Sequence, residues 1–169
     1  MPIKGKTAQG YNDSSCWARG QAWGIYGLTI GYSYTKNHCL IKDAKRLANY
    51  FLNHLPDDYV CYWDLEFTSG IEERDSSAAA IAACGLMKLS SFLSEDDPDK
   101  ERYVDEALKI LESLSSSYVT EKFVPGCGIL LHSVYNKPAG VGVDEYSTWG
   151  DYFFVEALMM VLESNMWFW

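Results

Sequence analysis

The chain is poor in basic residues. Its 169 residues include only 14 Lys and Arg against 23 Asp and Glu, so the formal net charge is -9 at pH 7. Binding to nucleic acid needs a basic surface that neutralises phosphates. The composition therefore argues against nucleic acid as a partner. An anionic ligand would need a local cation to overcome the repulsive field of the protein.

Paired cysteines and long apolar runs are also missing. The five cysteines form no Cys-x-x-Cys pair and are widely spaced, at Cys16, Cys39, Cys61, Cys84 and Cys127. They predict neither a disulfide framework nor a zinc site. No apolar run has the length of a membrane span, and residues 1–7 contain no hydrophobic signal core. We expect no metal, no cofactor, no membrane association and a cytoplasmic location.

Aromatic residues, by contrast, are abundant. The chain has 12 Tyr, 7 Phe and 6 Trp, and 48% of its residues are hydrophobic. This supply is enough for a substantial core, and the length fits one domain over residues 1–169 or a part of a larger one. Trp and Tyr also line sugar sites, because their ring faces stack on C–H surfaces.

Hydrophobic periodicity predicts an all-α fold with five helices. The spacing indicates helices over residues 15–34, 40–54, 78–93, 101–114 and 149–163. Residues 78–93 are apolar on nearly every side, as in a helix that is buried all round, whereas residues 40–54 and 101–114 are amphipathic. Between the last two helices the helical period is lost, and residues 129–135 could form a short strand.

The predicted helices repeat as hairpins. The similar runs at residues 22–27 and 82–87 lie sixty positions apart, and residues 151–159 start a third unit. Alternation of buried and amphipathic helices is typical of an array or of a closed toroid of helical hairpins. Gly20, Gly24, Gly27 and Gly31 would weaken the first helix, and we expect them where a neighbouring helix or a ligand comes close.

The segment from Gln9 to Trp23 is the strongest functional signal. Turn residues lead into a helix start that carries two indoles, Trp17 and Trp23, with the guanidinium of Arg19 between them. Backbone N–H groups at a helix start also favour an anion. The set suits a ring that bears a carboxylate. Helical packing alone remains the alternative, because aromatics at helical spacing are usually core.

Six sequence blocks in order resemble the unsaturated glucuronyl hydrolases of glycoside hydrolase family 88. The blocks are Gln9-Gly10-Tyr11, Trp17-Ala18-Arg19-Gly20-Gln21-Ala22-Trp23, Arg74-Asp75-Ser76-Ser77-Ala78-Ala79-Ala80, Gly128-Ile129-Leu130-Leu131-His132, Gly142-Val143-Asp144-Glu145 and Trp149-Gly150-Asp151-Tyr152-Phe153. The resemblance implies part of an (α/α)6 toroid. It covers roughly the carboxyl-terminal half of the family pattern, so the toroid would be incomplete.

The resemblance also implies a substrate and a reaction. The substrate class is an oligosaccharide that ends in a 4,5-unsaturated uronic acid, the product of a polysaccharide lyase. An Asp protonates the vinyl ether and helps a water attack, with no metal. Gln9 and Arg19 would contact the sugar and its carboxylate, Trp17 and Trp23 would form aromatic walls, and Tyr135 would border the neighbouring sugar. The family's catalytic Asp residues precede the first matched block, so no catalytic residue is assigned here.

Other polar and aromatic residues have plainer interpretations. We expect capping for Asp13, Asp75 and Asp144, and a first-turn role at a helix dipole for Asp151. His38 and His54 look like surface residues, and His132 a hydrogen-bonded structural residue in an apolar setting. Packing is expected for the remaining indoles, Trp63, Trp149, Trp167 and Trp169.

Two hypotheses follow from the sequence. In the first, the chain belongs to an unsaturated uronyl hydrolase and supplies the binding half of its site. In the second, it is a catalytically incomplete module that binds an acidic sugar or self-associates. Part of a toroid leaves inner helices without neighbours and exposes apolar surface, so we expect self-association or pairing with a missing amino-terminal half.

Overall fold

A computed structural model describes residues 5–122 and 125–162 of the chain. Within these residues the elements follow in the order α1 (Ala18–Thr35), α2 (His38–Leu52), α3 (Ser76–Ser91), α4 (Asp99–Ser117), β1 (Ser133–Asn136), β2 (Val141–Glu145) and α5 (Thr148–Leu162). The five helices match the predicted ones, with ends that differ by a few residues. Among the described residues, the short hairpin is the one regular element that is not helical.

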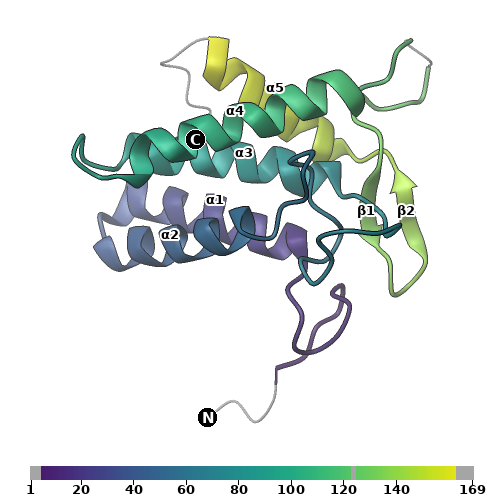
Figure 1. Ribbon diagram of the computed structural model, residues 1–169, viewed down its shortest axis with the longest axis horizontal. Helices are drawn as coiled ribbons and strands as arrows, with labels where there is room; N and C mark the ends of the chain where they lie inside the picture. The colour runs from purple at the N-terminus through teal and green to yellow at the C-terminus, as the bar shows by residue number, and fades with distance from the viewer. Residues whose placement is uncertain (1–4, 123–124, 163–169) are drawn as a thin grey trace.

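The helices form two layers. Helix α3 packs against α1 on one side and α5 on the other, while α2 packs on α1 and α4 packs on α3. In Figure 1 the three helices α1, α3 and α5 all begin at the end of the molecule where the β hairpin lies. The first turns of three helices, far apart in the sequence, therefore share one end of the bundle.

Helix α3 is the centre of the core. Fourteen of its residues are buried, five of them Ala, and they include Lys88, the basic residue of its last turn. Small side chains let helices approach closely: a Cβ built on Gly85 would lie 2.9 Å from Ile25 Cγ2 and 3.0 Å from the Tyr26 backbone nitrogen of α1. The expectation of a helix buried all round is confirmed.

Helices α2 and α4 are the amphipathic outer pair. Helix α2 buries Ala44, Ala48 and Phe51, and Asn37 caps its start by accepting a hydrogen bond from the Cys39 backbone N–H. Against this helix, Cβ atoms built on Gly24 and Gly31 of α1 would meet the side chains of Leu47 and Leu40. These two glycines serve the close approach that the sequence predicted, whereas the space around Gly27 is open.

The β hairpin was only half predicted. Strand β1 pairs antiparallel with β2, with Val134 opposite Val143 and Asn136 opposite Val141. The expected strand over residues 129–135 begins four residues later, because Leu130 instead forms an isolated bridge with Val119. The tight turn uses the positive φ angles of Gly140 and Gly142, which glycine adopts without strain.

Two of the predicted capping roles are wrong. Asp75 does cap α3, accepting from the Ala78 N–H, and Asp151 does lie in the first turn of α5. Asp13 instead accepts a hydrogen bond from the Thr7 backbone N–H in the loop before α1. Asp144 lies within β2 and accepts from His132. Both sit in turn-rich sequence, where a carboxylate can bond to a loop or a side chain as readily as to a helix.

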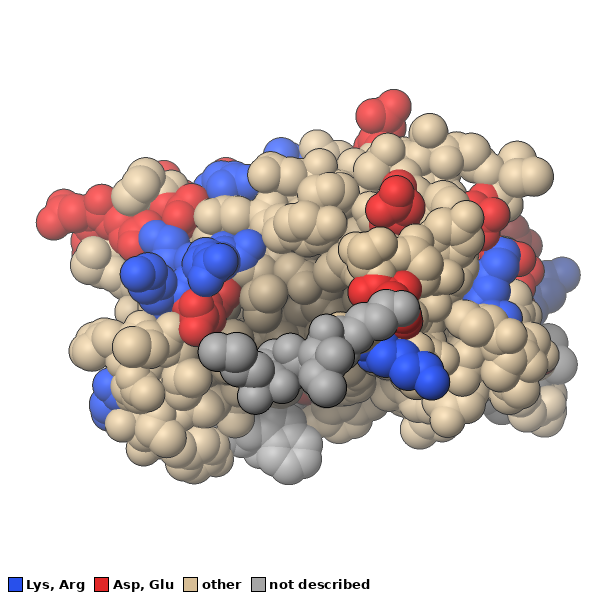
Figure 2. Space-filling view, turned by 90° about the horizontal axis from the view of Figure 1, so that it is seen from below, with Lys and Arg blue, Asp and Glu red and all other residues tan. Residues whose placement is uncertain are grey.

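In Figure 2 acidic and basic side chains gather closely at one end of the face, and further charged side chains are scattered over the other half. Among the described helices, none is both long enough and apolar enough to cross a membrane.

Candidate functional site

The loop before α1 is fastened to the loop after α2 by one buried carboxylate. Asp64 is fully buried, and its Oδ2 accepts hydrogen bonds from the Tyr11 backbone N–H and the Ser15 hydroxyl, both at 2.8 Å. Backbone hydrogen bonds from Ala18 to Trp63 and from Leu65 to Cys16 add to this connection. Gln9 and Trp17 are thereby held at the helix end shared by α1, α3 and α5.

Arg19 forms a buried ion pair at this end. Its side chain is 3% exposed, and Nη1 donates to Oδ2 of Asp75 at 2.7 Å, where Asp75 is fully buried. Asp75 also accepts from the Ser77 hydroxyl at 2.5 Å and from the Ala78 backbone N–H. One carboxylate therefore caps α3 and anchors the first turn of α1 at the same time.

The environment of Asp75 has opposing effects on its pKa. Burial raises the pKa of the carboxyl, while the charge of Arg19 and the hydrogen bonds from Ser77, Ala78 and Val134 act in the lowering direction; the net direction is upward. A buried charge of this kind is tolerated only with its partner in place. The charge of Arg19 is thus balanced inside the protein.

Arg19 and Gln9 converge on the backbone of β1. Arg19 donates from Nη1 to the Val134 carbonyl and from Nη2 to the Tyr135 carbonyl, the latter at 2.5 Å. The side-chain amide of Gln9 donates to the same Tyr135 carbonyl at 2.9 Å. Three of the predicted site residues, distant in sequence, therefore meet at one carbonyl oxygen.

Aromatic rings surround the guanidinium. Its carbon lies 4.7 Å from the centroid of the Trp17 ring and 5.5 Å from that of Trp149, within the range of cation–π attraction. The Tyr135 and Trp149 rings are 5.7 Å apart. Gly20 leaves room for the first of these rings, because a Cβ there would lie 2.7 Å from Trp17.

Trp23 lies farther along α1. Its side chain is 37% exposed, and its ring contacts Phe153 of α5 edge-on at a centroid distance of 5.1 Å. The ring contact with Phe153 therefore connects Trp23 to α5, while Gln9, Trp17, Arg19 and Tyr135 form the connected group. Trp23 lines the α5 side of the inner layer, one turn deeper than Arg19.

Sequence reasoning missed two members of this cluster. Trp149 was predicted to serve packing, and it does pack against the core. Its indole N–H also donates to Ser77 Oγ at 3.1 Å. Ser77 in turn bonds to Asp75, so the chain of contacts runs from α5 through α3 to Arg19. The matched blocks at residues 74–80 and 149–153 were the available signal. Trp63 is buried, as expected, and Trp167 and Trp169 lie outside the described residues.

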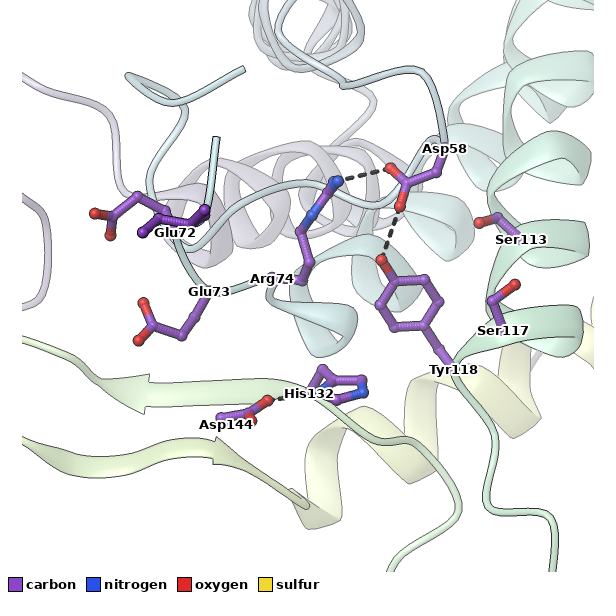
Figure 3. A pocket seen from close by; sticks show the side chains of 10 residues that line it. Asp58, Glu72, Glu73, Arg74, Ser113, Ser117, Tyr118, His132 and Asp144 are labelled. Atoms are coloured by element: carbon purple, nitrogen blue, oxygen red, sulfur yellow. Dashed lines mark hydrogen bonds and ion pairs between the residues drawn. The ribbon is translucent and has the colours of Figure 1, made fainter. Parts of the chain in front are cut away.

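His132 occupies a different setting from the predicted one. Its ring Nδ1 lies 2.5 Å from Asp144 Oδ1, so it is hydrogen-bonded as expected, but its side chain is 47% exposed and not enclosed by apolar groups. Figure 3 shows this pair at the edge of a cavity of about 440 Å³, opposite Asp58, Arg74 and Tyr118. His38 begins α2 and is exposed, as predicted.

Within residues 5–122 and 125–162, no group of three or more His, Cys, Asp or Glu side chains is placed to hold a metal ion. The cluster around Arg19 instead offers the N–H donors of a guanidinium and an amide, together with aromatic faces. Such groups suit a polar ligand with a ring.

Comparisons with known proteins identify relatives over almost all of the chain, although no protein-family model matches it. An unsaturated chondroitin disaccharide hydrolase of Streptococcus pneumoniae is 48% identical over 160 residues, which are 94% of this chain and 40% of the relative. An unsaturated glucuronyl hydrolase of Bacillus sp. is 40% identical over 168 residues, or 45% of its length. The chain spans less than half the length of these curated relatives.

Solved structures agree with the sequence matches. A mutant unsaturated glucuronyl hydrolase of Streptococcus agalactiae, complexed with dGlcA-GalNAc6S, superposes with a TM-score of 0.93 at 46% identity, covering 100% of this chain and 45% of that one. An unsaturated glucuronyl hydrolase specific for heparin superposes with a TM-score of 0.86 at 35% identity. The two helical layers are therefore a part of an (α/α)6 toroid, with α1, α3 and α5 inside. By sequence and by fold, the chain is homologous to a part of the unsaturated glucuronyl hydrolases.

Proposed function

We propose that the chain supplies the sugar-binding part of an unsaturated glucuronyl hydrolase that releases 4,5-unsaturated uronic acid from lyase-generated oligosaccharides. The observation that carries this proposal is the relative solved with dGlcA-GalNAc6S, which superposes on the entire chain. The cluster around Arg19 supports it independently, because it joins an amide, a guanidinium and aromatic faces at one end of the inner helices.

The roles of the site residues follow from their contacts. Gln9 and Arg19 hold the Tyr135 carbonyl and would direct their remaining N–H groups to the sugar. With its charge balanced by Asp75, Arg19 would orient the sugar carboxylate more through directed hydrogen bonds than as a free cation. Trp17 and Trp23 would form the walls of the pocket, and Tyr135, 48% exposed, would border the next sugar.

The acid that protonates the vinyl ether is assigned to a different part of the enzyme. The carboxylates of the cluster have other partners: Asp75 is paired with Arg19 and Asp64 fastens two loops. A general acid must reach the reacting atoms of the substrate with its proton. We assign that group to the portion of the relatives that this chain does not cover, and the enzyme to the cytoplasm.

The partner surface for that portion would be the outer side of α5. A mainly apolar groove of about 470 Å³ runs there, lined by Ile129, Thr148, Asp151, Tyr152, Val155 and Glu156. Val155 and Val161 are each 45% exposed on the same helix. In a closed toroid an inner helix has neighbours on both sides, and the relatives are more than twice as long as the matched region. The proposed occupant is the amino-terminal part of the toroid.

A complementation experiment tests the proposal. The chain is mixed with a polypeptide that corresponds to the uncovered amino-terminal part of a relative, and loss of the vinyl ether absorbance of an unsaturated chondroitin disaccharide is followed. Turnover is expected in the mixture and not with either polypeptide alone. Gln9→Ala should lower turnover in the mixture, and Ser116→Ala, on the outer helix α4, should not. Turnover by the chain alone at the rate of a full-length relative would show that the acid lies within it.

The second candidate function is a non-catalytic module that self-associates. The exposed apolar side chains of α5 favour it, because an uncovered patch on a soluble protein is a site of association. Sedimentation of the chain with Val155→Lys distinguishes the two candidates. If this variant is monomeric, the wild type oligomeric and the mixture with the amino-terminal part still inactive, the module is the better description.

A further inference from the structure

A separate cavity shares no lining residue with the Arg19 cluster. Its walls come from the loop after α2, the carboxyl end of α4 and the start of the hairpin, and it measures about 440 Å³. In Figure 3 the labelled side chains of these elements surround a common space, with Ser113 and Ser117 on α4 facing the side that carries Arg74, His132 and Asp144. None of its lining residues has a role in the proposed function.

The cationic side chains at this cavity are each paired with a carboxylate. Arg74 donates to Asp58 at 2.8 Å, Lys137 is paired with both Glu72 and Glu73, and His132 is bonded to Asp144. Carboxylates outnumber cations in the lining. An anionic ligand would lose its hydration without finding a free cation, so the cavity favours a neutral ligand over an acidic one.

The polar atoms of the cavity are mainly acceptors. When the neutral imidazole of His132 donates from Nδ1 to Asp144, its Nε2 is an acceptor, and carboxylate oxygens accept only. The hydroxyls of Ser113 and Ser117 both donate and accept. This pattern matches a ligand with many hydroxyl donors.

The backbone is strained at both members of the hydrogen-bonded pair His132 and Asp144. His132 has a φ of 63° and Asp144 a φ of 60°, a left-handed conformation that non-glycine residues seldom adopt. These two residues face each other at the bulged start of the hairpin, where the register shifts between Ser133 and Val134. Strain of this kind is concentrated at functional positions. It holds two polar side chains outward at the cavity edge, away from the core.

From the cavity, its paired cations and the outward-facing His132–Asp144 pair, we infer a second carbohydrate site that takes a neutral, hydroxyl-rich sugar of one or two rings. Hydrogen bonds from sugar hydroxyls to His132, Asp144 and Ser117 would hold it. This site is separate from the Arg19 cluster, which shares none of its lining residues and contacts β1 through the carbonyls of Val134 and Tyr135.

Titration of the full chain with lactose, followed by amide NMR, tests this inference. Shifts are expected at Tyr118, His132 and Asp144 with an affinity on the order of 1 mM. Ser113→Trp fills the cavity from α4 and should weaken binding by at least about tenfold. Ser116→Trp is the matched control, because Ser116 is exposed on the same helix and does not line the cavity. Its affinity should stay at the wild-type value.

Each other outcome overturns the inference. No saturable shift, or equal weakening by the two tryptophan variants, would remove the site. Tighter binding of glucosamine or of glucuronate than of lactose would show that charge, and not hydroxyl donors, selects the ligand. Shifts confined to Gln9 and Tyr135 would place the neutral sugar in the Arg19 cluster. Since no activity is measured, failure of this inference leaves the proposed hydrolase function standing.

Discussion

The bodies of the inner helices and the end at which they begin are held together in different ways. Along its length α3 buries mainly apolar side chains, including five alanines, Ile81, Leu86 and Leu89, and its polar groups there are few: the buried Lys88 and the bonds of Cys84 and Ser90 to carbonyls of α5 and α4. At its start, within two turns, the same helix meets a buried ion pair, a serine hydroxyl and an indole N–H. One helix thus changes from apolar packing to polar pairing.

This difference separates stability from recognition. Apolar packing is non-directional and tolerates substitutions that conserve volume. A buried ion pair is directional, and removal of one partner leaves an uncompensated charge. The packed bodies hold the helices side by side, while the polar end fixes the Tyr135 carbonyl and the side chains of Gln9 and Trp17 at a single place. Substitutions should therefore affect the two regions differently.

The largest effect is expected from Asp75→Ala. It leaves Arg19 buried without its counter-charge and removes the cap of α3, so the free energy of unfolding should fall by about 3–5 kcal/mol. Urea denaturation measures the change. A loss below about 1 kcal/mol would mean that water or another acceptor takes over the role of the carboxylate.

A double substitution at the same place sharpens the comparison. Replacing both charges, with Arg19→Met and Asp75→Leu, should restore much of the lost stability, because well-packed apolar residues can substitute for a buried pair. Binding of the unsaturated disaccharide should nevertheless be lost, because the double variant has no guanidinium at position 19. If the double variant binds the sugar as the wild type does, the polar end serves folding alone.

A smaller loss is expected in the packed body from Gly85→Ala. The new Cβ would lie within 3.0 Å of the Tyr26 backbone nitrogen, which cannot move without shifting α1, so we expect a loss of about 1–3 kcal/mol. Gly27→Ala is the matched control, since no atom lies within 4 Å of its added Cβ; it should gain up to about 1 kcal/mol of helix propensity. Thermal melts of both variants reveal the difference in sign, and two equal shifts would contradict close packing at Gly85.

The smallest effect is expected on the outer layer, where Lys45 pairs with Asp97 and Asp99 at 2.8 Å and 2.9 Å. The hydrogen bond from Lys45 lowers the pKa of the Asp97 carboxyl. Because the folded-state pKa lies below the unfolded one, the stabilisation is present above about pH 4 and disappears as the pH falls through the lowered value. Asp97→Asn should cost about 0.2–1 kcal/mol at pH 7, less at high salt and nothing near pH 2. Urea denaturation across this range tests the trend, and a cost that grows on acidification would reverse its sign.

The same contrast explains what could be predicted from the sequence. The helix bodies follow from hydrophobic periodicity, which is a local property, and all five were predicted within a few residues of their ends. The caps of Asp13 and Asp144 were wrong because their hydrogen bonds reach Thr7 and His132, partners that no local rule selects. Strand β2 carries little apolar signal and was missed altogether.

Part of the candidate site was also predictable. The resemblance supplied Gln9, Trp17, Arg19 and Tyr135, and these four form a connected group. Ser77 and Trp149 lie in matched blocks, but their contacts and the burial of Arg19 could not be predicted from the sequence. They depend on three helices beginning at the same end, which is a consequence of the tertiary arrangement. The binding roles themselves stay predictions until a sugar is titrated.

The central claim, that this chain supplies the sugar-recognition part of the enzyme, is tested most directly by NMR of the indole N–H groups during titration with an unsaturated chondroitin disaccharide. We predict saturable shifts of the Trp17 and Trp149 signals, weakened at least about tenfold by Gln9→Ala. We further predict weaker binding of the saturated disaccharide. Unshifted signals for both indoles at saturating disaccharide, with and without the amino-terminal part of a relative, would contradict the claim.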